Sequence, residues 1–192
     1  MPITSARFVW PIGDGLVLMP RTPAIAIAYH ALLAANHARL ALWSPGLGEP
    51  TPEGTRTALA TAAAAWLAGT RLPLAIGVPT GNGHNLVGAT NLTIDAPTAS
   101  AELGFWVDAA AEGRGIVSRT LHAVLDHAFG DLGLHRVEMR TLTTNHRSHR
   151  LADRLGFLRE GVLRDAVRFP DGPRDVAVYA LLAKDFTPPA AR

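Results

Sequence analysis

The chain has 192 residues, of which 48% are hydrophobic and 18% are charged, and this balance excludes intrinsic disorder and suits one packed domain. No cysteine is present, which excludes disulfides, thiolate zinc sites and a cysteine nucleophile and fits a cytoplasmic location. The net charge of +2 comes from basic residues scattered along the chain, which argues against a nucleic-acid-binding surface.

The N-terminal part predicts one strand and two helices. Pro11, early in the chain, interrupts any signal-peptide core, and no apolar run reaches the roughly 20 residues needed to cross a membrane. Residues 16–20 alternate as a strand does, and residues 23–35 have helical composition. Thr51, followed by proline at the first helical position and an early glutamate, has the pattern of a helix cap, so a second helix is predicted that leads into residues 57–67 and stops at Gly69.

Three neighbouring strands are predicted in the middle of the chain. Residues 72–78 and 86–94 are apolar runs separated by a glycine- and asparagine-rich turn at residues 80–84, which is typical of a hairpin. Residues 101–107 follow after another turn and are expected to pair with the hairpin as a third strand.

Residues 102–118, ELGFWVDAAAEGRGIVS, carry the strongest functional signal, because an apolar strand, a short loop and a helix start follow one another directly. A helix start presents unpaired backbone N–H groups and the positive end of the helix dipole. Gly113 and Gly115 allow a ligand to approach these amides without meeting a Cβ, and Arg114 between them adds a positive charge. The stretch therefore predicts a seat for a pyrophosphate.

Two known kinds of phosphate loop do not fit this stretch. A Walker loop ends in Gly-Lys-Ser/Thr, whereas the only lysine of the chain is Lys184. The dinucleotide fingerprint needs a third glycine where this chain has Ser118. Neither a nucleoside-triphosphate loop nor a dinucleotide loop is therefore predicted.

The helix that follows Gly115 is expected to bury one apolar face and to end at Gly133. That face comprises Val117, Leu121, Val124, Leu125, Ala128 and Leu132. Residues 136–142 then form a strand, and Asn145 caps a short helix that stops at Gly156.

Residues 158–169 and 176–182 are predicted as a closing antiparallel pair around a turn at residues 170–173. The total of about seven strands and about four helices, with the strands clustered early and late, predicts an α+β fold with a mixed, mostly antiparallel sheet. The whole of residues 1–192 is expected to form a single domain.

The loop over residues 112–117 resembles the acyl-CoA loop Gln/Arg-x-x-Gly-x-Gly/Ala of the GNAT superfamily of N-acetyltransferases. Glu112 stands where that pattern has Gln or Arg, and Val117 stands where it has a second small residue. Valine still supplies a backbone N–H, whereas Glu112 places an anion near phosphates and would have to point away from them.

A more specific series of matches follows downstream. Over roughly residues 86–186 the chain resembles the branch of the Rim-type ribosomal-protein N-terminal acetyltransferases, through the strand motif Glu-Leu-Gly-aromatic-Trp and three later segments in the family order. Those segments are LHRVE at residues 134–138, NHRS at residues 145–148 and RLGFLREG at residues 154–161.

The resemblance implies the GNAT fold, in which two neighbouring parallel strands splay apart. Here they would be residues 101–107 and 136–142, with the thioester arm lying between them. Residues 1–70 would supply an N-terminal strand and the acceptor-side helices, and residues 86–186 would form the cofactor-binding and catalytic core. Trp43 would be a wall of the acceptor pocket, and a homodimer is common in the family.

Acyl transfer from a thioester to an amine needs a base, donors for the developing oxyanion and a proton for the thiolate. Glu102 is the candidate base, directly or through a water, although it could equally be a solvated acid at a strand start. The N–H of Val107 is the candidate oxyanion donor. By the resemblance, Ser148 lies near the leaving sulfur and Asn145 bonds the pantetheine arm; the alternative for Ser148 is a serine that caps its own backbone.

The residues predicted to bind the cofactor come from the strand, the loop, the helix start and the NHRS segment. They are Phe105, Trp106, Val107, Gly113, Arg114, Gly115, Ile116, Val117, Ser118, Arg119, Asn145 and Ser148. No metal is expected, because His146 and His149 have no convincing further ligand nearby.

The function predicted from these observations is transfer of an acetyl group from acetyl-CoA to a primary amine, either a protein N-terminal α-amine or a small-molecule amine. Direct attack in a ternary complex is expected, because no cysteine is available to carry the acyl group. Two alternatives remain at this stage: a non-catalytic acyl-CoA sensor and a succinyl-CoA-dependent transferase.

Overall fold

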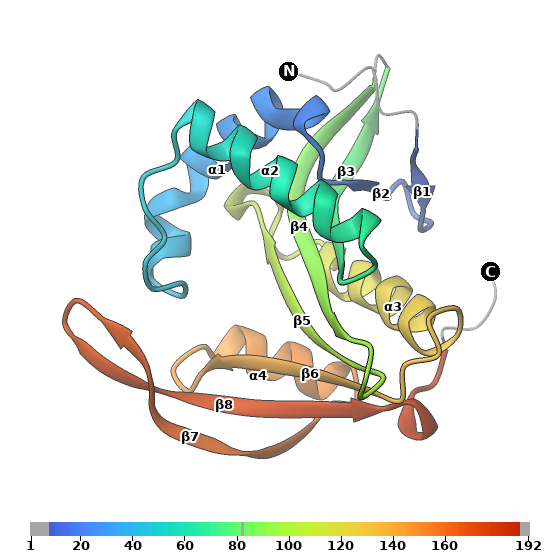
Figure 1. The fold of residues 1–192 in the computed structure, drawn as a ribbon, viewed down its shortest axis with the longest axis vertical. Coiled ribbons are helices and arrows are strands. Elements are labelled where there is room, and N and C mark those ends of the chain that lie inside the picture. The colour runs from blue at the N-terminus through green and yellow to red at the C-terminus, as the bar shows by residue number, and fades with distance from the viewer. Residues whose placement is uncertain (1–7, 82, 189–192) are drawn as a thin grey trace.

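The computed structural model describes residues 8–81 and 83–188, and these form one eight-stranded sheet (Figure 1). The strand order is β1-β2-β3-β4-β5-β6-β8-β7, with β5 and β6 as a parallel pair within an otherwise antiparallel sheet. The strands are β1 (Trp10–Pro11), β2 (Val17–Pro20), β3 (Arg71–Thr80), β4 (Gly83–Asp95), β5 (Ser100–Val107), β6 (Arg136–Leu142), β7 (Leu158–Phe169) and β8 (Gly172–Leu182). The helices are α1 (Ala26–Ala41), α2 (Pro52–Leu67), α3 (Ile116–Phe129) and α4 (His146–Arg154).

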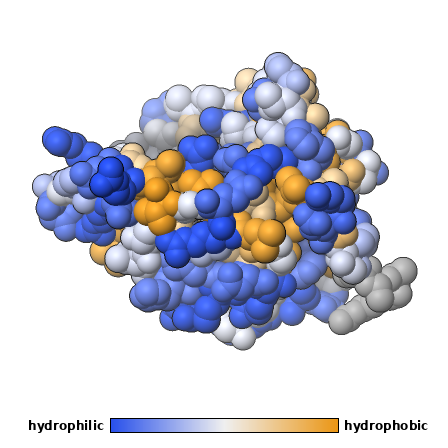
Figure 2. Space-filling view, turned by 90° about the horizontal axis from the view of Figure 1, so that it is seen from below, coloured by the Kyte–Doolittle hydropathy of each residue, from blue (hydrophilic) through white to orange (hydrophobic). Residues whose placement is uncertain are grey.

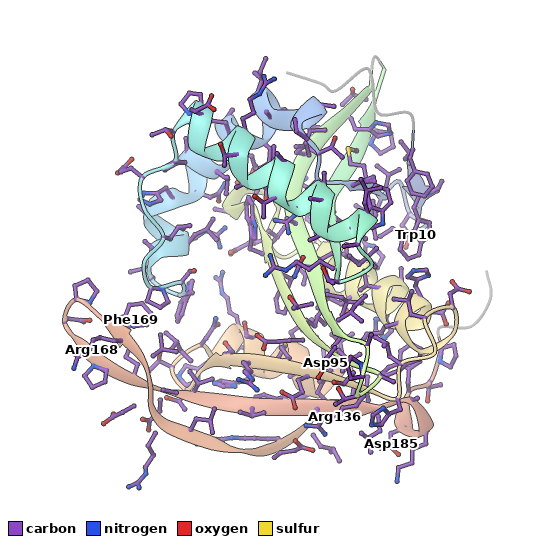
Figure 3. The ribbon with its side chains drawn as sticks, in the orientation of Figure 1. Trp10, Asp95, Arg136, Arg168, Phe169 and Asp185 are labelled. Atoms are coloured by element: carbon purple, nitrogen blue, oxygen red, sulfur yellow. The ribbon has the colours of Figure 1, made fainter. Side chains whose placement is uncertain are left out.

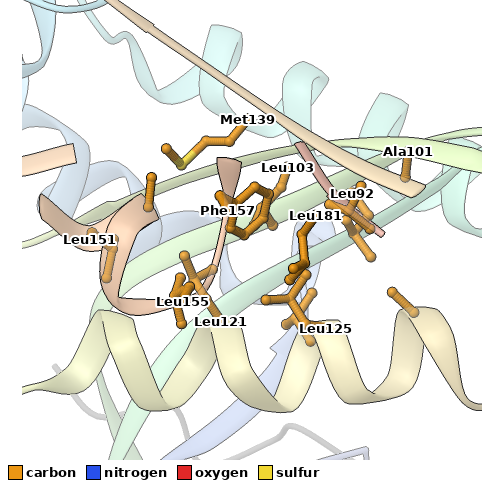
Figure 4. Packing of buried hydrophobic residues seen from close by; sticks show 14 of the residues in the cluster. Leu92, Ala101, Leu103, Leu121, Leu125, Met139, Leu151, Leu155, Phe157 and Leu181 are labelled. Carbon is orange, nitrogen blue, oxygen red and sulfur yellow. The ribbon is translucent and has the colours of Figure 1, made fainter. Parts of the chain in front are cut away.

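The helices cover both faces of the sheet because successive strand residues point to opposite sides. In β2, Leu18 belongs to the core cluster under α3 and α4, whereas Val17 and Met19 belong to a second cluster with α1 and α2. Figure 4 shows Leu121 and Leu125 of α3 packed against the sheet, and both side chains are fully buried. This packing fixes the start of α3 relative to β5 and β6.

The predicted α+β class and mostly antiparallel mixed sheet are confirmed, but the strand count was one short. The missed strand β1 has two residues and includes Pro11, so it carries no alternating pattern. It is a strand through its pairing with β2, where Trp10 lies opposite Leu18, and the Trp10 ring also packs against His127 of α3. The predicted hairpin of β3 and β4 is also confirmed, although residue 82 of its turn lies outside the described residues.

Two helix predictions were wrong in extent. A 3-10 turn over Pro23–Ile25 precedes α1, which then continues to Ala41 instead of stopping near residue 35. The second helix, α3, ends at Phe129 rather than near Gly133, because Gly130 is its C-cap and the chain turns away there. Leu132 is consequently 40% exposed, and Leu134 takes the buried position.

Among the described residues, no helix combines the length with the apolar character that crossing a membrane requires.

Candidate active site

The parallel strands β5 and β6 separate part of the way along their length. They pair only from Ser100 opposite Arg136 to Glu102 opposite Glu138. Both strands continue beyond this point and stay paired with their outer neighbours, β4 and β8 (Figure 1). Figure 3 shows Arg136 at the closed end of the pair. The predicted splay is therefore confirmed, and it begins directly after Glu102.

The backbone of β5 directs hydrogen-bonding groups into this opening. Asp108 donates its N–H to the carbonyl of Val87 in β4 at 2.8 Å. Because antiparallel pairing alternates along a strand, the polar backbone groups of Phe105 and Val107 point the other way, toward β6. The Val107 carbonyl accepts a hydrogen bond from the Arg39 guanidinium, and the Val107 N–H is directed at the opening. An extended chain with amide groups, such as a pantetheine arm, can pair with such a strand edge.

The helix start after β5 has the geometry of an anion seat. Gly115 is the N-cap of α3 in the left-handed conformation, with φ of 69°, and Gly113 has φ of 76°. A Cβ built on Gly113 would meet nothing within 4 Å, and one built on Gly115 would meet only the Arg119 guanidinium, at 3.0 Å. The backbone N–H of Arg119 donates to the Gly115 carbonyl, which is the first hydrogen bond of the helix. The N–H groups of residues 116–118 precede it and have no helical acceptor, so they remain available to an anion.

The other residues predicted at the seat differ in what they can offer. The Ile116 side chain is buried in the core, so this residue can contribute only its backbone N–H. Val117 and Ser118 are half-buried, and Arg114 is exposed between the two glycines. Arg119 lies beside Gly115 and forms an ion pair with Asp14, with 3.7 Å between Nε and Oδ2.

A cavity of about 170 Å³ occupies the splay. It brings together three residues predicted to bind the cofactor, Phe105, Asn145 and Ser148, and places Trp43 from the α1–α2 loop in its wall. The full lining comprises Trp43, Leu103, Gly104, Phe105, Met139, Arg140, Thr141, Leu142, Asn145 and Ser148. The opening between the strands therefore continues into a small, partly open cavity next to the start of α4.

Asn145 and Ser148 are positioned by the start of α4. The Asn145 side chain accepts a hydrogen bond from the Ser148 N–H at 3.2 Å, which confirms Asn145 as the helix cap. Only the backbone N–H of Ser148 takes part in this cap, and Ser148 itself lines the cavity. The cap thus fixes the position of the candidate proton donor relative to β5.

Asn145→Ala is expected to lower the free energy of unfolding by about 1 kcal/mol and also to weaken coenzyme A binding. Thr51→Ala is the matched control, because Thr51 caps α2 by accepting from the Gly54 N–H, away from the cavity. It should cost a similar free energy and leave binding unchanged. Urea denaturation and calorimetric titration measure the two effects, and equal affinities in both variants would contradict a ligand role for Asn145.

Glu102 lies on the edge of the cavity rather than in it. It is two residues before Gly104 on the same face of β5, its side chain is 54% exposed, and its Oε2 is 3.7 Å from Nε of Arg140. Arg140 also donates a hydrogen bond to Glu138 on β6 at 3.1 Å. Sequence reasoning missed Arg140 as a lining residue, because its place in the site depends on where the strands part.

Glu138 is held as an anion by its neighbours. Hydrogen bonds from Arg136, and then from Arg140, keep the pKa of Glu138 below its ordinary value of 4.5. A carboxyl group whose pKa is lowered on folding stabilises the fold above its unfolded pKa and loses that contribution as the pH falls through the folded value. Its lowered pKa also makes Glu138 a weaker base than an unperturbed carboxylate.

Glu138→Gln is therefore expected to reduce the free energy of unfolding at neutral pH and to have a shrinking effect below pH 4.5. Urea denaturation of the variant and the unmodified chain at a series of pH values measures the difference. A difference that stays constant into strong acid would show that the effect does not come from ionisation.

One tryptophan and one histidine near the site make contacts that hold helices against the sheet. Trp106 packs against Tyr29 of α1, with ring centroids 6.2 Å apart, on the face away from α3. His149 contacts the Tyr179 hydroxyl at 2.8 Å and the Thr143 carbonyl at 3.0 Å, which ties α4 to the sheet. Because a carbonyl only accepts, the ring nitrogen facing Thr143 carries the proton.

Sequence reasoning missed a polar cluster that links α1 to the end of β5. Asn36 is 3% exposed; its side chain donates to Asp108 at 3.1 Å and accepts from the Ala109 N–H at 3.0 Å. Arg39 donates to Asn36, Val107 and Glu112. No sequence signal pointed to these residues, because α1 was expected to end before them.

Comparison with known proteins gives consistent results. The family described as acetyltransferase (GNAT) domain matches residues 16–158 of this chain. The ribosomal-protein-serine acetyltransferase of Escherichia coli is 34% identical over 87 residues, which cover 45% of this chain and 49% of that protein. The chain thus matches about half the length of this curated relative.

Solved structures match nearly the whole chain. The RimJ protein of Mycobacterium smegmatis, in complex with CoA-disulfide, is 25% identical with a TM-score of 0.81, covering 96% of this chain and 91% of that one. A RimL ribosomal L7/L12 α-N-protein acetyltransferase in complex with coenzyme A has a TM-score of 0.85 at 24% identity, covering 91% and 98%. The second likeness is one of fold.

Proposed function

Because this chain belongs to the GNAT family of acetyltransferases, we propose that it transfers the acetyl group of acetyl-CoA to a primary amine. The observation that carries the proposal is the junction of two features in one place. The amides at the start of α3 form an anion seat, and the splay of β5 and β6 leads from the neighbouring strand into the cavity. A diphosphate on the seat and an amide-containing arm along β5 match the two ends of coenzyme A.

The proposed reaction is direct attack of the neutral amine on the thioester carbonyl carbon. Glu102 accepts the amine proton, directly or through a water, and the Val107 N–H donates to the developing oxyanion. As the tetrahedral intermediate collapses, the carbon–sulfur bond breaks, and Ser148 supplies a proton to the thiolate; Ser148 regains a proton from solvent, to which Glu102 releases the proton taken from the amine. The products are an amide and free coenzyme A. Ser148 on the cavity wall and Val107 at the splay support these roles.

The acceptor in this proposal is a protein N-terminal α-amine, with a small-molecule amine as the alternative. The names of the ribosomal-protein relatives support the first choice, and the proposed location is the cytoplasm. We also propose that the chain forms a homodimer. Its support is the edge strand β7, where Leu158 is 69% and Leu163 is 45% exposed. The face seen in Figure 2 carries apolar patches among hydrophilic ones.

A thiol-release assay tests the function. The purified chain is incubated with acetyl-CoA or succinyl-CoA and a panel of N-terminal peptides, amino acids and small amines, and free coenzyme A is measured. The enzyme should release thiol with acetyl-CoA in an acceptor-dependent manner. Binding of coenzyme A without release for any acceptor would identify a sensor instead, and release with succinyl-CoA alone would change the donor.

A further inference from the structure

Glu112 joins three parts of the molecule at the edge of the anion seat. It directly precedes Gly113, and its Oε1 accepts a hydrogen bond from Nη1 of Arg39 in α1 at 2.9 Å. Its Oε2 pairs with the guanidinium of Arg147 in α4. Since α1 and α4 pack on opposite faces of the sheet, the loop before α3 is fastened to both. The carboxylate is thereby turned toward two cations.

The two arginines that pair with Glu112 differ in exposure and in their number of other partners. The Arg39 side chain is 30% exposed and is also fixed by bonds to Asn36 and to the Val107 carbonyl. The Arg147 side chain is 74% exposed, and within the described part of the chain Glu112 is its one partner. An exposed ion pair is a weak interaction, so Arg147 can leave Glu112 at little cost, whereas Arg39 stays.

The position of Arg147 places it beside the route that a donor must take. It lies in the first turn of α4 between Asn145 and Ser148, which line the cavity, while Glu112 adjoins the glycines of the seat. The ion pair therefore connects the two elements that flank the path from seat to cavity.

We propose that Arg147 binds the diphosphate of the acyl-CoA, and that Glu112 holds this arginine beside the seat until the donor arrives. The inference rests on the proposed function, because it takes the ligand to be acyl-CoA. A diphosphate carries more negative charge than a carboxylate, and a guanidinium matches phosphate oxygens in a two-bond arrangement, so exchange favours the donor. Glu112 remains paired with Arg39 and faces away from the phosphates.

Substitutions at the two ends of the ion pair have opposite expected effects. Arg147→Ala should raise the Kd for coenzyme A about tenfold, the loss of one charge-assisted contact. Glu112→Gln removes the competing anion, keeps an acceptor for Arg39 and should lower the Kd several-fold. Calorimetric titration with coenzyme A measures both dissociation constants. Arg154→Ala, on the last turn of α4, is the control and should leave the Kd unchanged.

A purely structural bridge predicts a different pattern, since loss of either partner would then weaken binding. A raised Kd for Glu112→Gln, or an unchanged Kd for Arg147→Ala, would overturn the inference. Titration with dephospho-coenzyme A separates the two phosphate sources: the tenfold effect of Arg147→Ala should persist with this ligand, and its disappearance would assign Arg147 to the 3′-phosphate. Absence of thiol release from acetyl-CoA by the unmodified chain would instead reject the proposed function.

Discussion

Gly115→Val is expected to weaken coenzyme A binding by about 100-fold, because it disturbs at least two amide contacts to a charged group. Gly115 caps α3 at φ of 69°, and a Cβ there would lie 3.0 Å from the Arg119 guanidinium, at the edge of the seat. The branched valine side chain would stand over the amides that hold the diphosphate. Calorimetric titration of the purified variant with coenzyme A measures the loss.

The control must separate loss of the seat from backbone strain. Gly133 also adopts the left-handed conformation, with φ of 62°, and a Cβ there would meet nothing within 4 Å. Gly133→Val should therefore destabilise the fold to a similar degree, by about 1–2 kcal/mol, without changing affinity. If both valine variants bind coenzyme A as the unmodified chain does, the helix start is not the diphosphate site.

Ser148→Ala is expected to slow turnover by about 100-fold, the lower end of the range for proton transfer by a positioned side chain. Its Kd for coenzyme A should stay within about twofold of the unmodified chain's value, because the backbone N–H of residue 148 still donates to the Asn145 side chain. Steady-state kinetics with saturating acetyl-CoA measures the turnover. A serine hydroxyl is a weak acid, so the residue assists the departure of a thiolate that already leaves readily, and activity should not disappear.

The conservative variant Ser148→Thr distinguishes the hydroxyl from the space that it fills. It retains a hydroxyl at the same place on α4 and should recover most of the turnover. Unchanged turnover in Ser148→Ala would remove the residue from the mechanism, and equal losses in both variants would point to packing instead of proton transfer.

The parts of the site that the sequence predicted are those fixed by local rules. A helix start directly after Gly115 and a helix cap at Asn145 are short-range signals, and both hold in the structure. The splay was expected through family resemblance, and the pairing of β5 and β6 confirms it. The loop, the two strands and the second helix start are therefore predictable from the sequence.

The parts that sequence could not predict depend on long-range contacts. Arg39 reaches Val107 and Glu112 across more than 60 positions of the chain, and no local pattern marks such a partner. Arg140 occupies an exposed position in the alternating pattern of β6, as arginines commonly do. It lines the cavity only because β5 diverges beside it. The same reason explains β1, whose two residues are strand only by virtue of β2.

The position of the donor is best tested by a crystal structure of the chain with coenzyme A bound. We expect diphosphate oxygens within hydrogen-bonding distance of the backbone amides of residues 116–118, and a pantetheine arm lying along β5 between Phe105 and Asn145. A diphosphate bound elsewhere, with the start of α3 facing only solvent, would contradict it.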